Sequence, residues 1–179
     1  MGATLGDAAA LGDESALSET PDPRHVLYRK YAAGAFRRAQ RLLGNAADAA
    51  EVVHDVFIAL FEQPQQHRGG SMNAYVYSAV THACLNRIRD RRNRTRLATE
   101  RTDAEAFDPG TSVEAALLAR DALAEMPDQL AQIAIYYYLD ELTHREIAEL
   151  LGCSHRHVGN MLQRLTRWAE QREPRAWRR

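Results

Sequence analysis

Apolar residues recur at three- and four-residue intervals along most of this chain, which is the spacing of an amphipathic α-helix. In the first half, the pattern predicts three helices, over about residues 23–43, 46–62 and 71–96. In the second half, it predicts four shorter helices, over about residues 112–125, 127–139, 143–151 and 154–172. No segment alternates apolar and polar residues at the period of two that a half-buried strand shows. The pattern therefore predicts an all-α fold.

Stretches without helical periodicity divide the predicted helices into two small domains. We expect these domains at residues 23–97 and 113–173, joined by a flexible linker over 98–112, which contains "DPG". Residues 1–22 are rich in alanine, glycine, serine and acids, so we expect a disordered acidic tail there. Residues 174–179 form a basic C-terminal tail.

The composition narrows the class of protein. Hydrophobic residues make up 45% of the chain, which is enough to build packed cores. No apolar run approaches the roughly 20 residues of a membrane-spanning helix, and no secretory signal opens the chain. We therefore expect a cytoplasmic protein without membrane insertion. Cys84 and Cys153 lie far apart and outside any CxxC pair, so we expect no disulfide framework.

The segment "THREIAELLGCSHRHVGNML" has the features of a helix-turn-helix. Ala148 is a small residue where the two helices would cross, and Gly152 suits the turn between them. Thr143 and Glu146 have the spacing of a capping box at the start of the first helix. We expect Ile147, Leu151, Val158 and Leu162 to provide the apolar contacts between the helices.

The outward face of the second of these helices carries polar residues suited to DNA. Asparagine and glutamine can pair bidentately with adenine, and arginine with guanine, while a helix N-terminus can meet a phosphate. The residues that we expect on this face are Ser154, His155, Arg156, Gly159, Asn160, Gln163 and Arg164. The alternative, that they form a solvated surface without a partner, remains open.

The helix over 71–96 carries aromatic residues first and arginines afterwards. Tyr75 and Tyr77 offer flat faces on which unpaired bases can stack. The arginines that follow can neutralise phosphates, and they are Arg87, Arg89, Arg91, Arg92, Arg94 and Arg96. This order suits single-stranded or partly opened nucleic acid. In the alternative reading, the tyrosines belong to the core and the arginines only keep the protein soluble.

The helix over 46–62 has a different character. Asp48, Glu51, Asp55 and Glu62 give it an acidic flank beside a wide apolar face. An acidic flank repels DNA and suits a protein partner.

These parts, in this order, resemble a bacterial sigma factor of the extracytoplasmic-function (ECF) type. "LYRKYAAGAFRRAQRLLGNAADAAEVVHDVFIALFEQ" and "GGSMNAYVYSAVTHACLNRIRDRRNR" resemble its first conserved portion and the segment that follows. "ALAEMPDQLAQIAIYYYLDELTHREIAELLGCSHRHVGNMLQRL" resembles its C-terminal domain. The resemblance covers about residues 24–97 and 113–170, and it implies region 2 and region 4 of a sigma factor.

The resemblance also implies partners and site residues. Core RNA polymerase, through the clamp helices of its largest subunit, would contact Asp48, Glu51, Val52, Asp55, Val56 and Ile58. The −10 promoter element would be read and opened by Tyr75, Tyr77, His82, Asn86, Arg87, Arg89, Arg91, Arg92 and Arg94. The −35 element would be read by the helix that Ser154 begins. An anti-sigma factor would cover these surfaces until a signal arrives, and no cofactor is implied.

Two other classes of function compete with this interpretation. A stand-alone helix-turn-helix regulator that binds duplex operator DNA would explain the C-terminal motif but not the acidic and arginine-rich helices. An enzyme is disfavoured because the sequence has no phosphate-binding glycine loop and no nucleophile beside a base. Cys153, His155 and His157 are spaced by two, so on a helix they point apart and predict no metal site.

Overall fold

The structure is a computed structural model of the chain, and it describes residues 22–62, 71–99 and 111–172. These residues form seven α-helices and no strand: α1 Pro23–Leu43, α2 Ala46–Glu62, α3 Met72–Thr99, α4 Thr111–Glu125, α5 Asp128–Ala134, α6 His144–Leu151 and α7 His155–Gln171. The predicted all-α fold is confirmed. The predicted acidic tail, apart from Asp22, lies outside the described residues, as do the basic C-terminal tail and most of the predicted linker.

The helices α1, α2 and α3 form a bundle whose starts are set by local capping. The Asp22 carboxylate accepts a hydrogen bond from the backbone N–H of Arg24 at 2.9 Å, and Pro23 occupies the first turn. Asn45 caps α2, because its side-chain oxygen accepts from the backbone N–H groups of Ala47 and Asp48. The apolar faces of the three helices meet in one core, in which Ala39, Ala49 and Val80 are fully buried.

The predicted helix-turn-helix is present in α6 and α7. The Thr143 side chain accepts from the backbone N–H of Glu146, whose carboxylate accepts from Thr143 in return, so the capping box is complete. Gly152 has a φ of 62°, in the left-handed region where glycine avoids the steric cost of a Cβ atom. Ile147 and Val158 are fully buried where the two helices meet.

The helix expected over 127–139 is regular only in its first half. The α-helix ends at Ala134, and the backbone continues as a wider π-helical turn, Ile135–Leu139. The backbone N–H of Asp140 donates to the Ile135 carbonyl at 2.9 Å, five residues back. Glu141 then adopts a φ of 55°, which is uncommon for a residue with a side chain.

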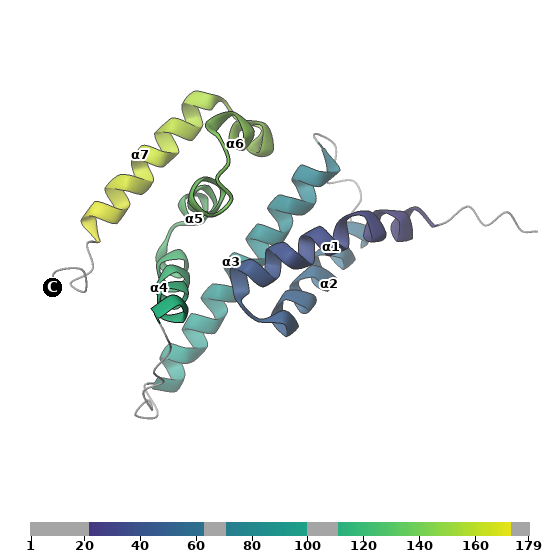
Figure 1. Cartoon of the computed structure of the whole chain (residues 1–179), viewed down its shortest axis with the longest axis horizontal. Coiled ribbons are helices and arrows are strands. Elements are labelled where there is room, and N and C mark those ends of the chain that lie inside the picture. Colours follow the sequence, from purple (N-terminus) through teal and green to yellow (C-terminus); the bar gives the residue numbers. More distant parts are fainter. Residues whose placement is uncertain (1–21, 63–70, 100–110, 173–179) are drawn as a thin grey trace, which may run out of the picture.

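The long helix α3 lies between two groups of helices (Figure 1). The helices α1 and α2 pack along one side of it, and α4 and α5 pack along another. The two predicted domains therefore touch each other directly. None of the described helices combines the length and the apolar character that a bilayer crossing requires.

Candidate nucleic-acid and partner interface

The acidic flank of α2 lies on the surface of the first bundle. Glu51, Asp55 and Ile58 are exposed, and the Asp48 side chain is partly exposed. Val52 and Val56 are only 3% and 8% exposed, and they pack in the core. The two valines therefore hold α2 in place, while the three carboxylates and Ile58 form the surface that a partner protein can touch.

Arg87 connects this flank to α3. Its guanidinium donates to Glu51 Oε2 at 2.8 Å and to Asp48 Oδ1 at 3.2 Å. The hydrogen bond to Glu51 raises the pKa of Arg87, burial opposes that effect, and the charges of Glu51, Asp48 and Asp55 add to the increase. Arg87 was expected at the −10 DNA, but here it joins the two helices.

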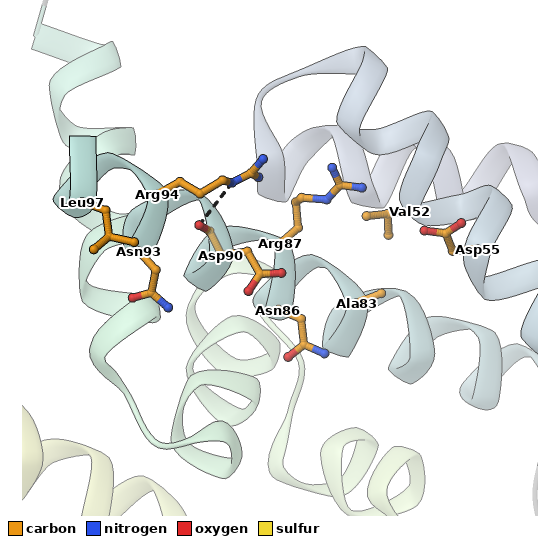
Figure 2. A pocket seen from close by; sticks show the side chains of 9 residues that line it. All are labelled: Val52, Asp55, Ala83, Asn86, Arg87, Asp90, Asn93, Arg94 and Leu97. Carbon is orange, nitrogen blue, oxygen red and sulfur yellow. Dashed lines mark hydrogen bonds between the residues drawn. The ribbon is translucent and has the colours of Figure 1, made fainter. Parts of the chain in front are cut away.

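A groove of about 670 Å³ runs between α2 and α3 beside this ion pair (Figure 2). Val52 and Asp55 border it from α2, and Asn86, Arg87 and Arg94 are among the α3 residues that border it. Arg94 turns back along its own helix, where its Nε donates to the Asp90 carbonyl at 3.4 Å. Two residues expected at the polymerase and three expected at the −10 element thus border the same groove.

The residues expected at the −10 element divide between several faces of α3. A helix turns about 100° per residue. Four of the residues therefore fall in one stripe, namely Tyr75, His82, Asn86 and Arg89. Arg87 and Arg94 lie on the side of the helix that borders the groove with α2, and Arg91 lies opposite the stripe. Arg92 pairs with Glu125 of α4, and Tyr77 faces α1.

The polar face of α7 is exposed as expected. Gly159 is half-buried, and the other six residues of the predicted −35 face are exposed. The apolar side of α7 differs in detail from the expectation, because Met161 and Leu165 are buried with Val158, whereas Leu162 is only half-buried. The rings of His155 and His144 lie 5.2 Å apart, so the start of α7 also contacts the start of α6.

No group of three or more histidine, cysteine or acidic residues is arranged to hold a metal ion within the described part of the chain. Cys84 is fully buried, and burial raises the pKa of its thiol to about 12. Cys153 is half-buried beside the turn of the helix-turn-helix.

Comparison with known families accounts for both groups of helices. Residues 27–94 match Sigma-70 region 2, and residues 116–165 match Sigma-70, region 4. Together these matches cover more than half of the chain. The chain belongs to the sigma-70 family. The bundle α1–α3 is its region 2, and the helices α4–α7, which contain the helix-turn-helix, are its region 4.

A relative supports the resemblance to the ECF type. The ECF RNA polymerase sigma factor SigE of Mycolicibacterium smegmatis is 26% identical to this chain over 170 residues. The aligned part covers 90% of this chain and 63% of that relative, so the chain spans less than two thirds of the relative's length.

Region 4 covers several of the residues that region 2 was expected to present to DNA. The Gln132 Nε2 atom of α5 lies 3.0 Å from His82 Nε2. Arg89 pairs with Asp128 and donates to the Met126 carbonyl at 2.9 Å, and Arg92 pairs with Glu125. These contacts occupy one edge of α3 and leave its groove with α2 uncovered.

A buried cluster of charged and aromatic residues lies at the centre of the contact between the regions. The Arg38 guanidinium donates to Asp140 Oδ1 at 2.9 Å, and from two nitrogens to Thr81 Oγ1 at 3.0 Å and 2.9 Å. The Arg38 Cζ atom lies 3.5 Å from the centroid of the Tyr77 ring, which is the geometry of a cation–π contact. Arg41 also pairs with Asp140.

Burial defines the electrostatics of this cluster. The side chains of Arg38 and Asp140 are only 6% and 3% exposed. Burial, followed by the neighbouring Asp140 carboxylate, raises the pKa of the Tyr77 phenol well above its ordinary value. Tyr77 therefore stays protonated and adds no charge to the cluster.

Arg38 and Asp140 were not among the functional residues that the sequence predicted. One signal was present, because Arg38 falls on the apolar stripe of α1 with Ala35 and Leu42, where a solvated charge is not expected. Asp140 carried no comparable signal, since it follows the helix expected over 127–139.

Proposed function

We propose that this chain acts as a sigma factor, which binds core RNA polymerase, recognises the −10 and −35 promoter elements and promotes strand opening. One observation carries the proposal: region 2 and region 4 of the sigma-70 family follow each other on one chain. This order accounts for the acidic α2, the arginine-rich α3 and the helix-turn-helix together.

In this proposal, α2 docks on the clamp helices of the polymerase's largest subunit. The exposed carboxylates of Glu51 and Asp55 would attract basic side chains, and Ile58 would supply an apolar contact. The ion pairs from Arg87 to Glu51 and Asp48 would transmit the position of the docked α2 to α3.

The helix α3 would then receive the separated strand of the −10 element. Base stacking on an aromatic side chain contributes about 1–3 kcal/mol per base, which offsets part of the cost of opening the duplex. Tyr75, His82 and Asn86 lie on the same stripe as Arg89. One strand that runs along α3 would therefore place its bases against the first three residues and a phosphate against Arg89. No covalent step is required, and we propose none.

The helix α7 would read the −35 element in the major groove. Its N-terminus, capped by Ser154, would meet a phosphate, and the exposed Arg156, Asn160 and Gln163 would reach base edges. The resemblance to ECF sigma factors further leads us to propose a cytoplasmic location and an anti-sigma partner that covers these surfaces.

The decisive experiment measures binding of the purified protein to bacterial core RNA polymerase. We expect tight binding that weakens by about tenfold when Glu51 and Asp55 are both replaced by alanine, because two interfacial charges are lost. Alanine at Glu149 and Glu170, two exposed acids of region 4, is the matched control with the same change in charge. A folded wild-type protein that does not bind core polymerase would refute the proposal.

A second experiment separates strand opening from docking. Alanine at Arg89, Arg91 and Arg92 should slow promoter opening, followed by the fluorescence of a 2-aminopurine base in the −10 element, and should leave polymerase affinity unchanged. An equal loss of both activities would contradict the division of work between α2 and α3.

The helix-turn-helix itself favours a second candidate, a stand-alone regulator that binds duplex operator DNA. Sequence-specific binding of the free protein to duplex DNA, with no affinity for core polymerase, would support this candidate over the sigma factor.

A further inference from the structure

The contact between region 2 and region 4 contains a site for an anion, and a side chain of the protein fills it. Asp140 extends from the end of the π-helical turn into region 2, where Arg38 and Arg41 both pair with its carboxylate. The Asp140 side chain is 3% exposed, so two arginines enclose one carboxylate away from solvent.

Region 2 supplies the donors of this site and the hydrogen bonds that orient Arg38, and the region 4 ring of Tyr136 lies 5.7 Å from the Arg38 Cζ atom. Thr81 Oγ1, on α3, accepts from the Nε and one Nη of Arg38, and itself donates to the Tyr77 carbonyl at 2.8 Å. The Tyr77 ring supports the guanidinium from one face. The other Nη of Arg38 is thereby aimed at the place that Asp140 Oδ1 occupies, at 2.9 Å. Region 4 contributes the occupant of the site.

We propose that Arg38 and Arg41 form a binding site for a backbone phosphate of single-stranded DNA, and that Asp140 occupies this site while the two regions are packed together. The proposal rests on the proposed function, in which region 2 receives a separated strand. A guanidinium offers paired donors that suit a phosphate as well as a carboxylate, and both ligands are anionic. Asp140 thus competes with DNA for the same donors.

The position of the site on α3 supports a strand as the competing ligand. Ser78 lies on α3 between the Tyr77–Thr81 side and the stripe that carries His82. In the packed arrangement, Gln132 Nε2 lies 3.2 Å from Ser78 Oγ and 3.0 Å from His82 Nε2. A strand that runs from the arginine site to His82 would cross the surface that α5 covers. Movement of region 4 away from region 2 would therefore expose the two arginines and this part of α3 at the same time.

The backbone departs from a regular α-helix on both sides of Asp140. The π-helical turn precedes Asp140, and Glu141 follows it with a φ of 55°, a left-handed conformation that is disfavoured for a residue with a Cβ atom. These turns place the Asp140 carboxylate against region 2, where its ion pairs with Arg38 and Arg41 link the two regions. Loss of those ion pairs should shift the population towards a state in which the regions are apart.

The test compares the affinities of full-length variants for a short fluorescein-labelled single-stranded oligonucleotide of mixed sequence, by anisotropy at low ionic strength. Replacement of Asp140 by alanine removes the carboxylate that competes with DNA for the two arginines. A larger fraction of the protein is then able to bind DNA, so we expect about tenfold tighter binding of the oligonucleotide. Asp140→Asn keeps the shape and removes the charge, and it should also tighten binding. Glu170→Ala removes one exposed acid elsewhere and measures the effect of net charge alone.

A second variant identifies the arginine site as the place where the phosphate binds. Arg38→Ala in the Asp140→Ala background should reverse the gain. It should also reduce the slope of log K against log salt by about 0.7, the value for one phosphate contact to a single strand. An unchanged slope and affinity would overturn the phosphate site. Small-angle scattering should show a larger radius of gyration for Asp140→Ala than for the wild type, and an unchanged radius would overturn the role of Asp140.

Binding to core polymerase, measured on the same samples, separates this inference from the proposed function. Wild-type protein that binds polymerase, with an Asp140→Ala variant that gains no more DNA affinity than Glu170→Ala, would refute only the inference. A gain in DNA affinity with no polymerase binding by any variant would support the phosphate site and refute the sigma factor.

Discussion

The turn after α1 provides a direct test of whether the two regions are packed together in solution. Gly44 ends α1 with a φ of 70°, and its backbone N–H donates to the Gln40 carbonyl at 2.8 Å. Arg120, from region 4, donates from Nε to the Leu42 carbonyl at 2.8 Å. The guanidinium lies so close that a Cβ atom on Gly44 would collide with it.

Alanine at Gly44 therefore has two costs. The left-handed backbone costs about 1–2 kcal/mol for a residue with a Cβ atom. Displacement of Arg120 weakens its charged hydrogen bond to the Leu42 carbonyl, which adds about 1 kcal/mol to the loss of stability. This is less than the usual cost of losing a hydrogen bond to a charged group, because the Arg120 side chain is flexible and partly exposed. The sum is about 2–3 kcal/mol in the wild type. With Arg120→Ala already present, only the backbone cost of about 1–2 kcal/mol should remain.

A double-mutant cycle measures the coupling between Gly44→Ala and Arg120→Ala, with each free energy of unfolding taken from a urea unfolding curve monitored by far-UV circular dichroism. Gly152→Ala calibrates the backbone cost alone, because its φ is 62° and no atom lies within 4 Å of an added Cβ. Gly34→Ala, in the exposed middle of α1, should instead stabilise by about 0.5–1 kcal/mol. An equal cost of Gly44→Ala with and without Arg120 would show that the regions are not packed as described.

Three further predictions concern region 4. Val158 is fully buried where α6 and α7 cross, so Val158→Ala should lower the free energy of unfolding by about 2 kcal/mol, measured from unfolding curves followed by tryptophan fluorescence. A loss of less than about 0.5 kcal/mol would contradict this packing. Hydrogen bonds from Thr143 lower the pKa of the Glu146 carboxyl in the folded protein. The ionised carboxylate therefore stabilises the fold at pH values above the ordinary glutamate pKa, and this stabilisation is lost as the pH falls through the lowered pKa of the folded state. Glu146→Gln should remove that acid dependence of the melting temperature. Alanine at Arg156 and Gln163 should change −35 preference in a promoter selection without changing stability, and unchanged preference would mean that another face of α7 reads the DNA.

Features that depend on neighbours in the chain were predictable from the sequence. The start of α6 was identified from the pair Thr143 and Glu146, because a capping bond spans only two or three residues. Gly152 marked the turn for the same reason, since a left-handed position favours glycine wherever it occurs. The period of the apolar residues then sufficed to establish the two helical groups.

Tertiary structure decided how those helices share their charged residues. Helical periodicity shows which residues share a face, but it does not show which helix covers that face. Arg38 bonds to Thr81 and Asp140, 43 and 102 residues away, and only the packing of α1, α3 and the π-helical turn brings these three together. Arg87 likewise pairs with Glu51, 36 residues away, although its neighbours in the sequence suggested DNA. In a densely charged helix, contacts between distant segments therefore decide which charged residues are paired within the protein, and the sequence pattern alone does not show them.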